Sequence, residues 1–210
     1  MANANVNKKF IESIAPFIVS EAQKRGYKYP SAIIAQACLE SAYGTSQLSA
    51  IYHNYFGLKC GTFWTGASVN MRTMEEYHKG TSVMIRDFFR AYADIEEGVK
   101  GYFDFISTRR YANLKSATSS KNYLEIIKGD GYATSSKYVD NVYAVVTKYD
   151  LTKYDAVEPA KASLDIDKIA KDVIKGKYGN GEDRKRNLSA IGVDYAAVQK
   201  RVNELLKGNK

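Results

Sequence analysis

Apolar side chains recur at helical spacing through much of the chain. One stripe runs from Phe10 to Ile18 and predicts a helix. Pro16 interrupts this stripe, so it fits either two helices or one kinked helix. A second helix is predicted to begin at Pro30 and to end at Gly44. The same periodicity predicts three further helices, over residues 95–107, 121–128 and 136–149.

A different pattern lies between these predicted helices. Residues 67–77 and 81–91 have alternating apolar and polar positions and are rich in β-branched side chains. The pair Lys79-Gly80 separates them, which is typical of a turn. We therefore expect a β-hairpin on a mainly helical domain, which is a mainly α (α+β) fold.

The composition changes near residue 153. Residues 153–163 include the run from Ala156 to Ser163, which has the composition of a linker. Helical periodicity then predicts three short helices, over residues 165–175, 182–191 and 194–207. We expect a first domain over residues 1–152, a linker over 153–163 and a three-helix bundle over 164–208.

Charge and aromatic content narrow the function without fixing it. The chain has 210 residues, a net charge of +8, 17 Tyr and 8 Phe. A basic and aromatic chain suits nucleic acid, but it suits an anionic polysaccharide equally, because flat rings stack on sugar faces. Composition therefore leaves both partners open.

Several chemistries are not expected. Cys38 and Cys60 are too few for a disulfide scaffold, and His53 and His78 lack the spacing of metal ligands, so we expect no metal and no cofactor. The chain has no apolar run long enough to insert into a membrane. Its first nine residues lack the charged start and apolar stretch of a signal peptide, so we expect synthesis in the cytoplasm without an export signal.

One carboxyl stands out among the predicted helices. Glu40 follows the apolar run from Ile33 to Leu39, so it is expected at the edge of the core. Partial removal from water raises the pKa of a carboxyl, which is what a general acid needs to protonate a glycosidic oxygen. A solvated acid at the end of a helix is the alternative interpretation of this residue.

The residues around Glu40 resemble a known family. Glu40 to Ser46 is similar to the E-S-x-x-G-x-S motif of family 73 glycoside hydrolases, the glucosaminidases. Further blocks resemble that family and occur in its order: Asn54–Lys59 (N-x-F-G-L-K), Thr73–Glu75 (T-x-E), Phe89–Tyr92 (F-R-x-Y) and Gly131–Tyr138 (G-Y-A-T-x-x-x-Y). The resemblance spans roughly residues 7–151 and implies a lysozyme-like α lobe with a hairpin beside a cleft.

The resemblance also implies roles for residues. Glu40 is expected as the general acid, and a second carboxylate is expected on the hairpin. The T-x-E spacing favours Glu75, while counting back from Arg90 favours Glu76. Since neighbouring strand residues face opposite sides, only one of them enters the cleft. Tyr132 is expected to line the cleft near the acid.

Other residues in these blocks are candidates for binding the substrate. They are Tyr43, Asn54, Phe56, Trp64 and Tyr138. Packing in the core is an alternative role for their rings, and for Phe56 it is at least as reasonable as a sugar contact. The hairpin carboxylate would either activate water or support the 2-acetamido group of the substrate as nucleophile.

The tail resembles the CW_7 cell-wall-binding repeat. Residues 176–184 match its G-x-(W/Y)-G-N-G-x-x-R core, and the family is a three-helix bundle that recognises muropeptides. Tyr178, Asn180, Gly181 and Arg184 are the expected ligand-binding residues, since a turn that opens a helix presents backbone N–H groups to anions. One repeat should bind weakly, so we expect avidity through weak self-association or through the catalytic cleft.

Together these patterns predict a peptidoglycan hydrolase, an endo-β-N-acetylglucosaminidase that cuts between N-acetylglucosamine and N-acetylmuramic acid. A hydrolase with a wall-binding module and no export signal is typical of a phage endolysin released by a holin. A lytic transglycosylase or muramidase is the main alternative, because these enzymes share a glutamate at a helix end. A non-catalytic wall-binding protein is the second alternative. A nucleic-acid partner is not expected.

Overall fold

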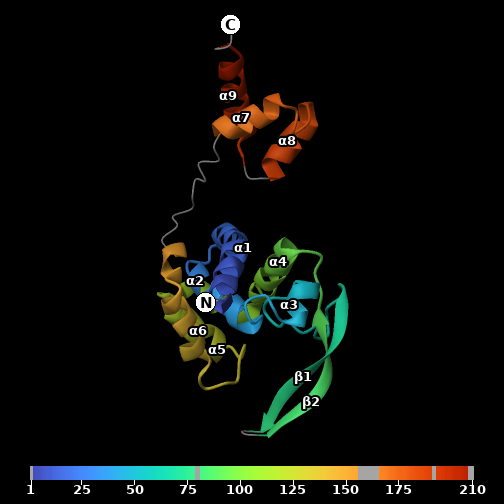
Figure 1. The fold of residues 1–210 in the computed structure, drawn as a ribbon, viewed down its shortest axis with the longest axis vertical. Coiled ribbons are helices and arrows are strands. Elements are labelled where there is room, and N and C mark those ends of the chain that lie inside the picture. Colours follow the sequence, from blue (N-terminus) through green and yellow to red (C-terminus); the bar gives the residue numbers. More distant parts are fainter. Residues whose placement is uncertain (1, 79–80, 156–165, 191–192, 208–210) are drawn as a thin grey trace. The chain divides into compact units, whose positions relative to one another are not determined.

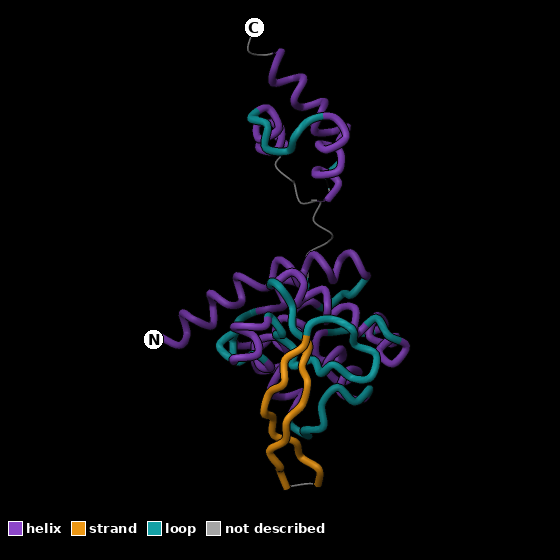
Figure 2. Tube along the Cα trace, turned by 90° about the vertical axis from the view of Figure 1, so that its right-hand side faces the viewer, coloured by secondary structure: helices purple, strands orange, loops and turns teal. Residues whose placement is uncertain are grey.

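The computed structural model describes residues 2–78, 81–155, 166–190 and 193–207. The chain divides into two compact units, Met1–Val157 and Glu158–Lys210, which are described one at a time. Within the described residues the first unit is mainly helical with one antiparallel hairpin, and the second is helical (Figures 1 and 2). This confirms the predicted mainly α fold.

The helices of the first unit largely follow the predicted ranges. α1 continues through Pro16, so the first stripe is one helix. The short helices α3, η1 and η2 had no clear periodicity and were not predicted. The elements are α1 (Ala2–Arg25), α2 (Pro30–Glu40), α3 (Gln47–Tyr52), α4 (Ile95–Ile106), η1 (Arg109–Ser116), α5 (Ser120–Gly129), α6 (Tyr138–Lys148) and η2 (Leu151–Tyr154).

α2 is the central helix of this unit. All its residues from Pro30 to Cys38 are buried, and α1, α5, α6 and η2 pack against it. Its first turn is capped from a distance, because the carboxylate of Asp155 accepts hydrogen bonds from the Ser31 backbone N–H (2.8 Å) and hydroxyl (2.6 Å). Residues 153–155 therefore belong to the first unit, although the sequence placed them in the linker; residues 156–163 lie outside the described part.

The end of α2 differs from the prediction. The helix stops at Glu40, four residues before Gly44, because Ala42 and Tyr43 adopt left-handed backbone conformations with φ of 49° and 56°. Gly44 itself has φ of 76°, and a Cβ there would lie 2.5 Å from the Phe10 ring. The turn therefore packs tightly on α1 and lets the acid emerge at the rim of the core.

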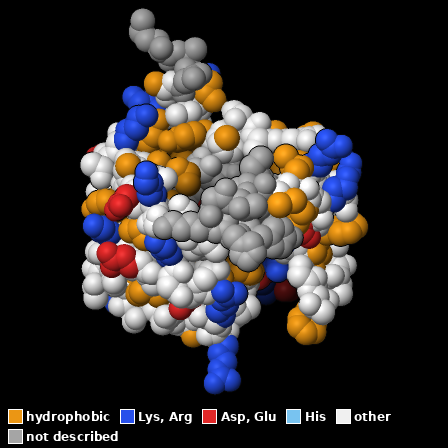
Figure 3. Space-filling model, turned by 90° about the horizontal axis from the view of Figure 1, so that it is seen from below, with side chains coloured by type: hydrophobic (Ala, Val, Ile, Leu, Met, Phe, Trp, Pro, Cys, Tyr) orange, Lys and Arg blue, Asp and Glu red, His pale blue; other side chains and the backbone are white. Residues whose placement is uncertain are grey.

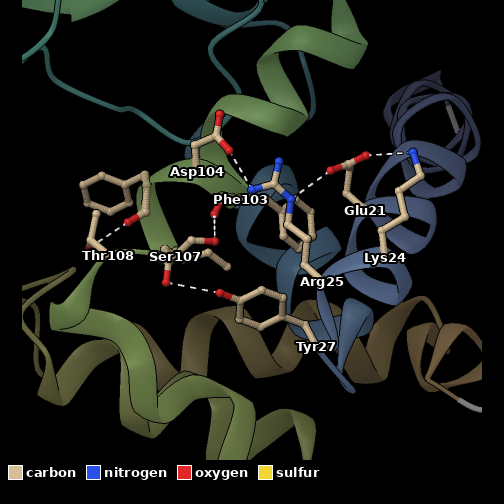
Figure 4. Close-up of polar contacts among 10 residues, drawn as sticks. Glu21, Lys24, Arg25, Tyr27, Phe103, Asp104, Ser107 and Thr108 are labelled. Atoms are coloured by element: carbon tan, nitrogen blue, oxygen red, sulfur yellow. Dashed lines mark hydrogen bonds and ion pairs between the residues drawn. The ribbon is translucent and has the colours of Figure 1, made fainter.

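α1 and α4 are joined at their ends by a polar cluster. Arg25 donates hydrogen bonds to Glu21 on its own helix (3.0 Å) and to Asp104 on α4 (2.6 Å), and Figure 4 shows its guanidinium between the two carboxylates. The Tyr27 hydroxyl donates to the Ile106 carbonyl (3.2 Å), also on α4. These contacts hold α4 beside the N-terminal helix.

The hairpin consists of β1 (Ser68–His78) and β2 (Thr81–Arg90) and projects beyond the helical lobe (Figure 1). Its register runs from Ser68 opposite Arg90 to Glu76 opposite Ser82, with an irregularity between Glu76 and His78. Two backbone hydrogen bonds, Cys60 N–H to Phe88 and Arg90 N–H to Leu58, attach the base of β2 to the preceding loop. This anchoring fixes where the hairpin leaves the lobe.

The second unit contains α7 (Ile166–Ile174), α8 (Gly181–Ala190) and α9 (Tyr195–Lys207), as the sequence predicts. Its small apolar core is built from residues on all three helices and from Val193, which lies between α8 and α9: Ile169, Ala170, Val173, Leu188, Val193, Val198 and Val202. A core of this size is near the lower limit for an independent fold. None of the helices that the structure describes in either unit is long and apolar enough to cross a membrane.

Candidate active site

Glu40 is the last residue of α2 and stands where the buried helix meets solvent. Glu40 is exposed to solvent, but the protein atoms around its carboxyl exclude enough water to raise the pKa of that carboxyl to about 7. A hydrogen bond with Tyr138 acts in the opposite direction and lowers this pKa. A substantial fraction of the Glu40 carboxyls therefore carries a proton at neutral pH, in a position from which it can be transferred.

Glycine at position 57 leaves room beside this acid. Gly57 has φ of 63°, and a Cβ built on it would lie 3.8 Å from Glu40 Oε2. The loop backbone therefore lies beside the carboxyl, and the left-handed conformation at position 57 is one that favours glycine. Gly57 lies inside the N-x-F-G block but was not among the predicted site residues.

A chain of buried polar groups leads from Glu40 into the core. Gln36, one turn before Glu40, donates from Nε2 to the Tyr138 hydroxyl oxygen (2.8 Å). Its Oε1 accepts a hydrogen bond from Tyr102 (2.8 Å), whose hydroxyl also contacts that of Tyr123 (3.1 Å). Because the Tyr138 oxygen already accepts from Gln36, its proton is available to Glu40.

These hydrogen bonds give Gln36 and Tyr138 structural roles that the sequence did not predict. Gln36 was missed, although a polar residue inside an otherwise apolar helix, four positions before the candidate acid, was a visible signal. Tyr138 was predicted to bind substrate, but its side chain is buried and occupied by Gln36 and Glu40. We correct that prediction: Tyr138 orients the acid.

Tyr132 lies beside this group and packs against the core, so its place in the cleft stays a prediction. Its hydroxyl donates to the Phe56 carbonyl oxygen (2.9 Å), and its ring centroid lies 6.1 Å from that of Tyr138. The Phe56 ring is 3% exposed and stacks on Tyr102 with centroids 3.9 Å apart. Phe56 therefore packs in the core, which is the role that the sequence made at least as reasonable as a sugar contact.

Asn54 also has a structural role. Its amide nitrogen donates to the carbonyls of Leu58 (2.8 Å) and Arg90 (2.9 Å), and its oxygen accepts from the Leu58 N–H (2.9 Å). The side chain is 2% exposed, so its polar atoms are used inside the protein. Asn54 ties the loop before the hairpin to the end of β2 rather than binding substrate.

The remaining aromatic candidates are half-buried. Tyr43 packs edge-on against Tyr149, with ring centroids 5.9 Å apart. Trp64 donates from Nε1 to the Ala67 carbonyl (3.0 Å), and the Arg90 guanidinium lies 4.6 Å from its ring centroid. Trp64 keeps a partly exposed ring near the base of the hairpin, so its role in binding sugar stays a prediction.

Only the backbone positions of the two candidates for the second carboxylate, Glu75 and Glu76, are described. Glu75 lies opposite Val83 and Glu76 opposite Ser82 in the hairpin register. The side chains of both glutamates lie outside the described part of the chain, so the choice between them stays a prediction. Among the described residues, no three His, Cys, Asp or Glu side chains come together in a way that could hold a metal ion.

In the second unit, the expected ligand residues surround the turn before α8. Asn180 and Gly181 are exposed, and Tyr178 is half-buried against the small core. Arg184 donates to the Gly179 carbonyl (3.1 Å), to Gln199 Oε1 (3.1 Å) and to Asn180 Oδ1 (2.9 Å). Arg184 is therefore not the free donor fork expected from sequence, because it holds the turn against α9.

A helical lobe that presents an acid at a helix end beside a hairpin is the architecture of lysozyme-like glycoside hydrolases. The catalytic domain of the autolysin Auto from Listeria monocytogenes has this fold, with a TM-score of 0.61 and 28% identity over 71% of this chain and 87% of that one. A peptidoglycan hydrolase mutant from Sphingomonas sp. A1 is also similar, with a TM-score of 0.61 and 30% identity over 70% and 96% of the two chains.

Two family models match the chain and identify its protein family. The glucosaminidase model, described as mannosyl-glycoprotein endo-beta-N-acetylglucosaminidase, matches residues 15–151, and the CW_7 repeat matches residues 167–206. The chain therefore belongs to the glucosaminidase family of glycoside hydrolases and carries a CW_7 repeat at its C-terminus.

Two relatives show how varied the family is. Exo-glucosaminidase LytG of Bacillus subtilis is 35% identical over 82% of this chain and 64% of its own length. A probable N-acetylmuramidase of Lactococcus lactis subsp. cremoris is 33% identical over 76% of this chain and 37% of its own length. The chain thus spans less than two thirds of either relative.

Replacing Tyr138 by Phe should change the pH dependence of activity. Loss of the hydroxyl removes a hydrogen bond to the Glu40 carboxylate, so the pKa of Glu40 should rise and the alkaline limb of kcat/KM should move to higher pH. Gln36 also loses a buried partner, which should lower the free energy of unfolding by roughly 1–3 kcal/mol. Tyr143→Phe, on the same helix, is the matched control. An unchanged alkaline limb in Tyr138→Phe would show that this hydroxyl does not act on the acid.

Replacing Glu40 by Gln should abolish catalysis and stabilise the fold at alkaline pH. The variant lacks the transferable proton, so activity should fall by about 10²–10⁴-fold or more. Ionising Glu40 destabilises the folded chain as pH rises from 4.5 to about 7, because the folded state holds the proton more tightly. Glu40→Gln should therefore have a higher Tm than wild type above pH 7 and an equal Tm below pH 4.5. Near-full activity, or a Tm difference that does not vary with pH, contradicts this account of Glu40.

Proposed function

We propose that this protein is an endo-β-N-acetylglucosaminidase that hydrolyses the β-1,4 bond on the reducing side of N-acetylglucosamine in peptidoglycan. The observation that carries the proposal is the Glu40 carboxyl, whose pKa of about 7 and hydrogen bond with Tyr138 suit a general acid. A basic chain also suits an anionic wall polymer. On the face in Figure 3, Lys and Arg side chains are more prominent than Asp and Glu.

In the proposed mechanism Glu40 donates its proton to the glycosidic oxygen as the bond breaks. The hairpin carboxylate, for which we favour Glu75 over Glu76, then either activates water on the opposite sugar face or supports the 2-acetamido group as nucleophile. Tyr138 keeps the Glu40 carboxyl oriented through its hydrogen bond.

Two rival activities act on the same glycan. A lytic transglycosylase or a muramidase would use the same helix-end glutamate, and one relative carries the name of a probable N-acetylmuramidase. We favour the glucosaminidase because its family model matches residues 15–151 and because the hairpin retains glutamates. A non-catalytic wall binder would not need a carboxyl with a raised pKa.

We further propose that the CW_7 repeat holds the enzyme on the wall by binding muropeptides. The exposed turn at Asn180 and Gly181 opens α8, and backbone N–H groups at a helix start attract carboxylates. One repeat binds weakly, so the cleft or weak self-association supplies avidity. The combination of a hydrolase and a wall module also fits an endolysin that accumulates in a host bacterium and reaches the wall through a holin.

The chemical identity of the new chain ends tests the proposed bond choice. Digested walls reduced with borohydride should yield glucosaminitol ends, because the cut lies on the reducing side of N-acetylglucosamine. Mass spectrometry of the reduced fragments measures this directly. Muramitol as the main product would identify a muramidase, and 1,6-anhydro ends a transglycosylase; either result rejects the glucosaminidase.

The same assay separates the two hairpin glutamates. Glu75→Gln should slow release of reducing ends strongly, while Glu76→Gln should retain most activity, because only one of two neighbouring strand residues faces the cleft. The reverse result would move the role to Glu76 without changing the bond that is cut.

Removal of the second unit should weaken wall binding and leave glycan cleavage intact. A chain ending at Ala160 keeps the whole catalytic unit, including the Asp155 cap on α2. Arg184→Ala should give a partial loss of binding, because it releases the Gly179–Asn180 turn from α9. Lys200→Ala removes an equal charge on α9 and is the matched control. Pull-down on purified walls measures binding; wall binding by the truncated chain equal to that of the full chain would rule out the module's role.

A further inference from the structure

A groove of about 320 Å³ lies between α3 and the base of the hairpin, apart from the residues around Glu40. Two residues of α3 form one side, and β1 together with Arg86 of β2 forms the other. The lining residues are Gln47, Tyr52, Val69, Asn70, Met71, Arg72 and Arg86. None of them was singled out by sequence, and none has a part in the proposed acid catalysis.

Two arginines give this groove its charge. Arg72 and Arg86 lie directly opposite each other on β1 and β2, and both are exposed. Arg86 donates to the amide oxygen of Asn70 (3.1 Å), but within the described side chains neither arginine has an acidic partner. Like charges facing each other across a strand pair are destabilising. An anionic ligand that contacts both guanidinium groups would offset this repulsion.

The backbone beside these arginines is also available to a ligand. β1 pairs only with β2 among the described strands, so its outer edge is open. The outer edge of β2 is partly covered at its base, where the loop residues Leu58 and Cys60 bond to it. An open strand edge binds an extended peptide through main-chain hydrogen bonds, and charged side chains nearby add selectivity.

We propose that this groove binds the peptide stem of the wall polymer, with Arg72 and Arg86 pairing to its carboxylates. The inference rests on the proposed function and adds a peptide subsite to it. Gln47 follows Glu40 by seven residues, so their Cα atoms lie within about 25 Å of each other. A short extended peptide attached to a sugar in the cleft covers a comparable distance. The enzyme thereby distinguishes peptide-bearing glycan from bare glycan.

Kinetics on two substrates test this subsite. Arg72→Gln and Arg86→Gln should each raise KM by about 2- to 5-fold on intact walls, in line with an exposed charge pair, and leave kcat unchanged. On glycan stripped of peptides by an amidase, both variants should match wild type, although that glycan carries free lactyl carboxylates. Arg109→Gln, which removes an equal exposed charge on η1, is the control and should match wild type on both substrates.

A binding measurement makes the test independent of catalysis. Titration of the ¹⁵N-labelled full chain with a synthetic stem tetrapeptide should shift the backbone amides of residues 69–72, and Arg72→Gln should reduce these shifts. Equal KM increases on both substrates, no KM change on intact walls, or no amide shifts in β1 would overturn the proposal. A failure of the glucosaminidase assignment appears separately, as the wrong reducing end in wild-type digests.

Discussion

The burial of α2 is the constraint on which the rest of the first unit depends. Nine consecutive residues, from Pro30 to Cys38, have no face toward solvent, so helices must surround them on every side. Each large apolar side chain buried in this way contributes about 1.5–3 kcal/mol relative to an exposed one. Glu40 is the last residue of this helix and follows the buried stretch by two positions. The left-handed turn at Ala42 and Tyr43 comes shortly after it, so the acid lies at the rim of the core.

The same burial explains why the acid has polar neighbours. A glutamine inside a core helix is destabilising unless each of its polar atoms has a partner. Gln36 meets this requirement with Tyr138 and Tyr102, and these hydrogen bonds also direct the Tyr138 hydroxyl toward Glu40. One network therefore stabilises the core and sets the protonation of the acid. Ionising Glu40 lowers the free energy of unfolding, because the folded state holds the proton more tightly than the unfolded state. This loss of stability accompanies a pKa that suits catalysis.

Local patterns in the sequence predicted the longer helices and the hairpin, because each depends on neighbouring residues, and the family resemblance singled out Glu40 as the candidate acid. The partners of these elements were not predictable in the same way. Gln36 and Tyr138 are 102 residues apart, and Ser31 and Asp155 are 124 apart, so only the packed fold brings them together. Asn54 looked like a cleft residue because it belongs to a motif, yet its amide is needed to join the loop to β2.

The central claim is that the protein around the Glu40 carboxyl removes enough water to raise its pKa to about 7, although a hydrogen bond with Tyr138 lowers it. The most direct test is a titration of the Glu40 side-chain carboxyl by ¹³C NMR in the full chain, assigned by its absence in Glu40→Gln. The account predicts a midpoint near pH 7. A midpoint near 4.5, the ordinary value of a glutamate, would contradict it.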